Sequence, residues 1–149
     1  MIDKDILLSK ADRVHRHVKR VKEKRPATLQ EFLSSLDLQE IILFNLQMAI
    51  QFCIDIASHI ISDEGLGLPG STNEMLYTLQ ENGYIPEDVA DKMVAAVGFR
   101  NLVVHEYTRV DLEEVYRISQ ENVDDLIEFL QPLLRRAGLA RAEEADGQI

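Results

Sequence analysis

The chain has 149 residues, of which 46% are hydrophobic and 28% charged, a composition that is typical of one globular domain and excludes a disordered protein. The formal net charge is −10, but residues 1–25 hold nine Lys or Arg and four Asp or Glu, so a basic segment precedes an acidic body. The single cysteine, Cys53, excludes a disulfide framework and a multi-cysteine zinc site, and fits a reducing, cytoplasmic location.

The first helix is predicted over Asp3–Lys24, and Arg25-Pro26 ends it because the residue before a proline avoids the helical region. Apolar residues recur every three or four positions, which predicts one buried stripe made of Leu7, Ala11, Val14, Val18 and Val21. The other faces carry basic residues, namely Lys10, Arg13, Arg16, Arg20 and Lys24. Three roles are open for this basic surface: guiding a nucleic acid, docking an acidic partner, or ordinary solvation.

The second helical region is predicted over Thr28–Ser62. Two boxes that are typical of helix N-termini, Thr28 with Glu31 and Asp37 with Glu40, predict a short turn followed by one long, strongly apolar helix. Residues 63–70 have the composition of a loop. We expect no signal peptide, because the first ten residues carry two aspartates and no apolar core, and no uninterrupted apolar run reaches the roughly 18 residues that span a membrane. We therefore expect no membrane partner.

Three more helices are predicted by their N-terminal and C-terminal signals, over 71–82, over 86–99 or as far as 105, and over 111–137 with a kink at Pro132. No strand alternation and no internal repeat is present.

The predicted fold class is all-α, an up-down antiparallel bundle of about five helices. It forms one domain over residues 1–137, followed by a small, charged tail over 138–149 that is expected to fray.

Residues 93–104 read MVAAVGFRNLVV, in which only Arg100 and Asn101 are polar. A helix that is apolar on every side must be buried on every side, and a small bundle covers only one side. We therefore expect a self-dimer through this segment. The alternative is that Gly98 breaks the helix, so that its two halves face different ways.

Arg100 lies on a stripe that is otherwise apolar, and no acidic residue lies one helical turn away. A buried arginine needs a partner, so Arg100 either binds an anion such as phosphate or pairs with an acid from another helix, such as Asp55. His105 follows five residues later, about 140° around a straight helix, so the two side chains converge only if the helix ends near Val104 or if two subunits share the site. The role of His105 is general acid–base catalysis or capping of the helix end.

Other polar residues have simpler interpretations. Asn45 lies on the apolar helix and either hydrogen-bonds to the 98–105 segment or makes a plain core hydrogen bond, which is the favoured role. His15 and His17 are two positions apart, cannot share a metal ion, and are expected to be solvated. Cys53 is expected to be an inert buried thiol.

The residues Arg100 to Tyr107 have the form R-x4-H-x-Y. This pattern resembles the HEPN superfamily and, within it, the HepT toxins that pair with MntA minimal nucleotidyltransferase antitoxins. Residues 45–50 and 55–61 look like the second helix of that family, and 98–105 followed by Val110-Asp111 looks like its signature block. The resemblance covers most of residues 1–135.

The resemblance implies a metal-independent endoribonuclease that works as a homodimer, without a cofactor, in a type VII-like toxin–antitoxin pair. Arg100 would hold the scissile phosphate of a transfer RNA or messenger RNA, and His105 would help the 2′-hydroxyl attack it. Tyr107 matches the tyrosine that the antitoxin adenylylates, and Asn101, Asn45 and Asp55 would support the site. Glu106 departs from the small residues that are common at its position. The alternative function is a non-catalytic or nucleotide-binding partner of a nucleotidyltransferase.

Overall fold

The computed structural model describes residues 1–139, which form helices joined by short loops and contain no strand. These helices are α1 (Lys4–Lys24), α2 (Leu29–Leu33), α3 (Leu36–Asp63), α4 (Thr72–Glu81), α5 (Glu87–His105), the 3-10 helix η1 (Tyr107–Arg109), α6 (Leu112–Glu121) and α7 (Asp124–Arg136). The all-α prediction is confirmed. The expected number of about five helices is too low, because the short turn predicted before α3 is the helix α2 and the region over 111–137 is divided in two. The tail predicted to fray covers residues 138–149, of which 140–149 lie outside the described part.

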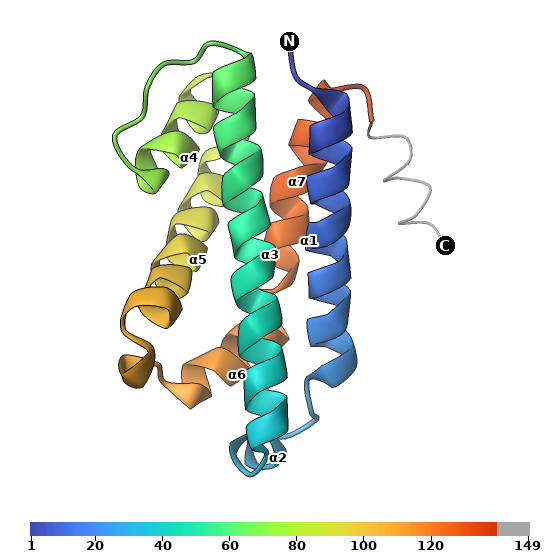
Figure 1. Cartoon of the computed structure of the whole chain (residues 1–149), viewed down its shortest axis with the longest axis vertical. Helices are drawn as coiled ribbons and strands as arrows, with labels where there is room; N and C mark the ends of the chain where they lie inside the picture. The colour runs from blue at the N-terminus through green and yellow to red at the C-terminus, as the bar shows by residue number, and fades with distance from the viewer. Residues whose placement is uncertain (140–149) are drawn as a thin grey trace.

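The long helix α3 is the centre of the bundle (Figure 1). It packs against α1, which runs antiparallel beside it, and against α4, α5 and α7. α6 closes the lower end of the view together with α2. The side chains that fill the centre are large and fully buried, and include Phe32, Ile42, Leu46, Ile56, Phe129 and Leu130.

α1 folds as its pattern predicts. Asp3 is the N-cap, and its carboxylate accepts hydrogen bonds of 3.1 Å from the backbone N–H groups of Asp5 and Ile6. The whole predicted apolar stripe is buried, so the helix is held by one face. Its basic residues are left at the surface and at the boundary with α3.

The second helical region is divided as expected, but α3 begins earlier than predicted. Thr28 caps α2 and forms the predicted box with Glu31, through hydrogen bonds of 3.2 Å and 3.0 Å. The predicted box of Asp37 with Glu40 is wrong, because Ser35 is the N-cap of α3 and accepts a hydrogen bond from the N–H of Leu38.

The single helix predicted over 111–137 is wrong. The chain turns at Asn122, so that α6 packs against α2 and α3 while α7 runs back along α1 and α5. Asn122 donates to the Asp125 carboxylate in the first turn of α7, and Val123 is buried at the turn. Tertiary packing therefore divides a stretch that is locally suited to one helix. α7 continues past Pro132 to Arg136.

α3 is long and apolar enough, by length and composition alone, to cross a membrane. However, 61% of its most apolar window is buried inside the bundle. The helix therefore has the role of a core helix in this structure, and the expectation drawn from uninterrupted apolar runs missed how apolar it is on average.

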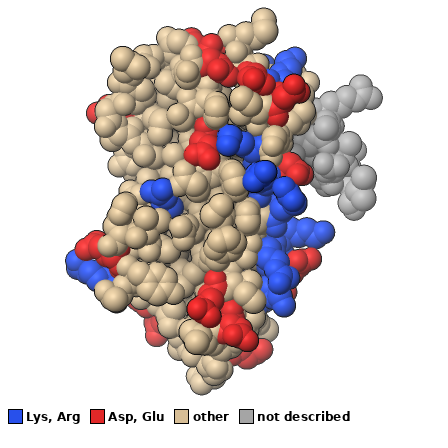
Figure 2. Space-filling view, in the orientation of Figure 1, with Lys and Arg blue, Asp and Glu red and all other residues tan. Residues whose placement is uncertain are grey.

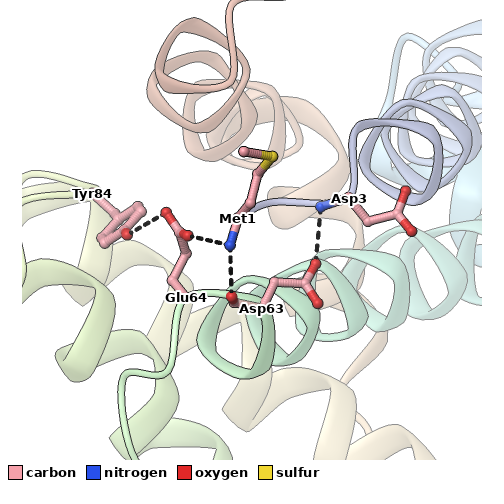
Figure 3. A network of polar contacts seen from close by, with 5 residues as sticks. All are labelled: Met1, Asp3, Asp63, Glu64 and Tyr84. Atoms are coloured by element: carbon pink, nitrogen blue, oxygen red, sulfur yellow. Dashed lines mark hydrogen bonds and ion pairs between the residues drawn. The ribbon is translucent and has the colours of Figure 1, made fainter.

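A network of polar contacts joins the start of α1 to the end of α3 (Figure 3). The amino group of Met1 lies 3.1 Å from Glu64 and donates to the carbonyl of Asp63, while the N–H of Asp3 donates to the Asp63 carboxylate. The Tyr84 hydroxyl donates to Glu64 at 3.0 Å. Hydrogen bonds from the amino group and from Tyr84 lower the pKa of Glu64. These contacts fix the end of the bundle opposite to the 98–107 segment.

Candidate active site

The helix that carries the R-x4-H-x-Y motif is continuous. α5 begins after Pro86, with Glu87 and Asp88 in its first turn, where acidic side chains interact favourably with the helix dipole. It runs through Gly98 to His105, so the predicted alternative of a break at Gly98 is wrong. A Cβ atom at Gly98 would meet no atom within 4 Å, which shows that this side of α5 is open.

The buried face of α5 changes along its length. The first half buries Val89, Met93 and Val97, whereas the second half buries Phe99 and Val103. The predicted stripe therefore reaches the surface at its C-terminal end, where Val104 is 42% exposed and Tyr107 is 57% exposed. The all-round burial expected for this segment is not achieved within one chain.

Arg100 is half-buried, and only neutral groups hold it. Its Nη1 donates to the side-chain oxygen of Asn101 at 2.8 Å, and its Nη2 donates to that of Gln51 on α3. Its Nε is buried and makes no hydrogen bond. Among residues 1–139 no carboxylate forms an ion pair with this guanidinium. The positive charge is thus oriented without being neutralised, which is the state that an anion-binding arginine needs.

Asp55 does not pair directly with Arg100, contrary to one of the two interpretations of the sequence. Gln51 lies between them: it accepts from Arg100 and donates to the Asp55 carboxylate at 2.9 Å. The other oxygen of Asp55 lies 3.6 Å from Nζ of Lys10 on α1. Three helices are therefore linked through one amide. The sequence analysis missed Gln51, although its i,i+4 spacing to Asp55 places both on one face of α3.

His105 and Tyr107 lie at the exposed end of the motif. His105 is the last residue of α5 and is exposed, and Tyr107 follows in η1. Because α5 continues through His105, the separation of about 140° from Arg100 around the helix axis applies. The two side chains of one chain therefore leave α5 in different directions. The sequence allowed them to converge if the helix ended near Val104, and this condition is not met.

Asn45 makes a core hydrogen bond, as favoured, rather than one to the motif. It is buried, its amide donates to the carbonyl of Ile41 at 2.7 Å, and its oxygen accepts from Nδ1 of His17 at 2.8 Å. The prediction that His17 is solvated is wrong, because this ring also stacks on Phe52 at 5.9 Å. Asn45 therefore joins α3 to α1.

The surroundings of Glu106 and Cys53 offset the charge of the first and lower the reactivity of the second. The Glu106 carboxylate lies 3.2 Å from Arg109 in the next turn, so a cation accompanies the acid that separates His105 from Tyr107. Cys53 is fully buried, as predicted, and burial raises the pKa of its thiol far above the usual range. Within residues 1–139 no group of three His, Cys, Asp or Glu is placed to hold a metal ion.

The face formed by α3 and α5 is largely uncharged, whereas Lys and Arg gather along α1 at one edge of it (Figure 2). Large apolar side chains are left open on both helices, among them Phe44 of α3, which is 56% exposed, and Val104 of α5. This surface adjoins Arg100, since Gln51 lies two turns from Phe44 on α3.

Comparison with known proteins matches residues 14–133 to the family described as ribonuclease HepT-like. The mRNA nuclease HepT of Shewanella oneidensis is 32% identical over 126 residues, which cover 85% of this chain and 94% of that protein. The tRNA nuclease HepT of Aphanizomenon flos-aquae is 28% identical over 77% of this chain and 78% of its own length.

Solved structures agree with these matches. The tri-AMPylated Shewanella oneidensis HEPN toxin in complex with the MNT antitoxin superimposes with a TM-score of 0.80 at 30% identity, covering 87% of this chain and 96% of that one. A toxin–antitoxin structure with AMP-PNP gives a TM-score of 0.79, also at 30% identity, with 86% and 97% covered.

Proposed function

Because the chain belongs to the ribonuclease HepT-like family and is an endoribonuclease of the toxin–antitoxin type, we propose that it cleaves RNA at a site built from Arg100 and His105. The observation that carries the proposal is the state of Arg100, a half-buried cation that is held by Gln51 and Asn101 with no carboxylate against it. Such a guanidinium binds a phosphate diester and stabilises the charge that develops on its oxygens.

His105 supplies the proton transfer. The exposed imidazole can take the proton of a ribose 2′-hydroxyl or give one to the leaving 5′-oxygen. The 2′-oxygen forms a bond to the adjacent phosphorus while the bond from phosphorus to the 5′-oxygen breaks. The products are a 2′,3′-cyclic phosphate and a 5′-hydroxyl, and the reaction needs neither a metal ion nor a cofactor.

The active form is a homodimer that dimerises through the motif segment. Arg100 and His105 of one chain leave α5 about 140° apart, so the proposal joins Arg100 of one subunit to His105 of the other in a shared cleft. The exposed side chain of Val104 supports it, because a second copy of the motif segment would cover it.

The antitoxin partner is an MntA-like nucleotidyltransferase, and its target on this chain is Tyr107. The solved relative is AMPylated and bound to such an antitoxin, and Tyr107 is exposed at the end of the motif. Transfer of AMP forms a bond from the tyrosine oxygen to the α-phosphorus of ATP and releases pyrophosphate. The added phosphate lies beside the Arg100 site and opposes the binding of RNA. The substrate is messenger RNA or transfer RNA in the cytoplasm.

The test is RNA cleavage in the presence of EDTA, with analysis of the product ends. The parent protein is expected to yield 2′,3′-cyclic phosphate ends, and Arg100→Ala and His105→Ala are each expected to lose activity while keeping the fold and partner binding. Lys92→Ala is the matched control, because it removes one exposed cation from the same helix, where Lys92 pairs with Glu128. Equal cleavage by all variants, or loss in the control, would contradict the assignment and favour a non-catalytic partner role.

A further inference from the structure

One line of side chains runs along α1 beside α3, and it is called here the basic stripe. It consists of Lys10, Arg13, His17, Arg20 and Lys24. The spacings of three, four, three and four residues keep these side chains on one side of the helix, over a length of about 21 Å. Figure 2 shows Lys and Arg gathered along this edge of the molecule.

Contacts with one ring show that the stripe borders α3 instead of pointing away from the bundle. Nζ of Lys10 lies 5.6 Å and Cζ of Arg13 lies 5.4 Å from the centre of the Phe52 ring, and His17 stacks on the same ring. Lys10, Arg13 and Phe52 line an open groove of about 500 Å³ between α1 and α3, which also includes Asp5 and His59. The groove is large enough for a nucleotide-sized ligand.

The stripe is joined to the proposed catalytic arginine by the contacts already described. Lys10 contacts Asp55, Asp55 accepts from Gln51, and Gln51 accepts from Arg100. Lys10, at one end of the stripe, is therefore linked to Arg100 through two side chains of one helix, α3. An RNA strand whose phosphate reaches Arg100 passes close to the stripe.

The stripe offers both kinds of contact that a single strand needs. Arg13 makes no ion pair with any residue in 1–139, and Arg20 has only an exposed contact of 3.9 Å with Glu23, so both charges are available to phosphates. Phe44, which meets His17 edge to face at 6.0 Å, presents an exposed ring on which a base can stack.

We propose that the basic stripe and the adjoining Phe44 bind the single-stranded RNA that flanks the scissile phosphate. This inference rests on the proposed ribonuclease function and extends it from the cleavage site to the substrate's path. Phosphate contacts and stacking do not distinguish one base from another, so the basic stripe and Phe44 bind single strands with little dependence on sequence. They disfavour duplexes, whose bases are already stacked.

The experiment measures binding of a fully 2′-O-methylated single-stranded RNA, which lacks the attacking hydroxyl, across a range of salt concentrations. The double variant Arg13→Ala/Arg20→Ala is compared with Arg16→Ala/Lys19→Ala. Both remove two exposed cations from α1, and in each pair one arginine has a weak ion pair with a neighbour, since Arg16 contacts Asp12 at 3.4 Å. Arg16 and Lys19 lie outside the stripe.

The stripe variant is expected to bind about tenfold more weakly, and its slope of log affinity against log salt is expected to fall by about 0.7 for each lost phosphate contact, while the control keeps the parent slope. Equal effects in the two variants, or none in either, would overturn the proposal. So would a stripe variant that binds RNA normally but no longer binds the nucleotidyltransferase partner, since the stripe would then be a protein dock.

Cleavage assays separate this inference from the proposed function. The stripe variant is expected to cut a ribodinucleotide, which is too short to reach the stripe, at the parent rate, and to cut long single-stranded RNA more slowly. A parent protein that binds the methylated RNA through the stripe but cleaves neither substrate would contradict the ribonuclease proposal and support RNA binding by the stripe.

Discussion

The side-chain oxygen of Gln51 on α3 accepts a hydrogen bond from Nη2 of Arg100 on α5, and the amide of the same glutamine donates to Asp55. A carboxylate at position 51 would hold the guanidinium equally well, but it would also cancel its charge. The amide of Gln51 orients Arg100 and also donates a hydrogen bond to the Asp55 carboxylate. Lys10 forms an ion pair with that carboxylate. The arrangement keeps one uncompensated cation at the surface of the motif.

Gln51→Glu is therefore expected to slow RNA cleavage by about 10²-fold, close to the effect of removing one transition-state donor, because the new carboxylate neutralises Arg100. The fold should persist, since the two side chains have the same shape. Gln51→Ala should instead weaken the orientation of Arg100 and have a smaller effect. The measurement is kcat and KM on one RNA substrate for each variant.

Gln47→Glu provides the control, because it adds the same charge one turn away on α3, where Gln47 is also half-buried. If Gln47→Glu slows cleavage as much as Gln51→Glu does, the effect is a general repulsion of RNA and the specific role of Gln51 is wrong.

Val104→Glu is expected to convert the proposed dimer to a monomer and to abolish cleavage, because it places a charge in the surface that a second copy would cover. Light scattering after size exclusion reports the mass. Leu8→Glu is a close match, since Leu8 of α1 is 44% exposed and Val104 is 42% exposed. A Val104→Glu protein that stays dimeric, or a Leu8→Glu protein that dissociates, would place the interface elsewhere.

Tyr107→Phe is expected to keep ribonuclease activity and to escape inhibition by the antitoxin, because only the hydroxyl that accepts AMP is removed. Mass spectrometry after incubation with the nucleotidyltransferase and ATP should show adenylylation of the parent and none of the variant. Tyr77→Phe, which changes a 39% exposed tyrosine on α4, should be modified like the parent. Modification of Tyr107→Phe at another residue would refute Tyr107 as the target.

Local patterns predicted most of the fold. The buried stripe of α1 and the box at Thr28 depend on spacing within one or two turns, and both are confirmed. The break at Asn122 depends on what α6 and α7 pack against, which no window of the sequence contains. Apolar spacing and capping residues therefore predict which helix face is buried. They predict less well where a long helical stretch divides into two helices.

The candidate site shows the same limit. Arg100 attracts attention because it is a cation in an apolar segment, which is visible in the sequence. Its partner Gln51 is an ordinary polar residue 49 positions earlier, and only the packing of α3 against α5 selects it over the other glutamines. His17 looked solvated for the same reason, since its contacts with Asn45 and Phe52 come from another helix.

The proposed cleft between two subunits leads to a test that is independent of any single variant. Arg100→Ala and His105→Ala subunits are each expected to be inactive alone. If Arg100 of one subunit works with His105 of the other, a mixed dimer holds one complete site and one empty site. Random mixing should then restore about a quarter of the parent rate, since about half of the dimers are mixed and each has one of two sites.

If both residues act within one chain, every site in the mixed dimer lacks one of them, and mixing restores nothing. Exchange of subunits is checked by giving the two variants different affinity tags and isolating the doubly tagged dimer before the assay. The continuity of α5 through His105, which keeps the two side chains about 140° apart on one chain, is the reason to expect recovery. An inactive doubly tagged dimer would mean that each chain brings the two residues together by a movement at the end of α5.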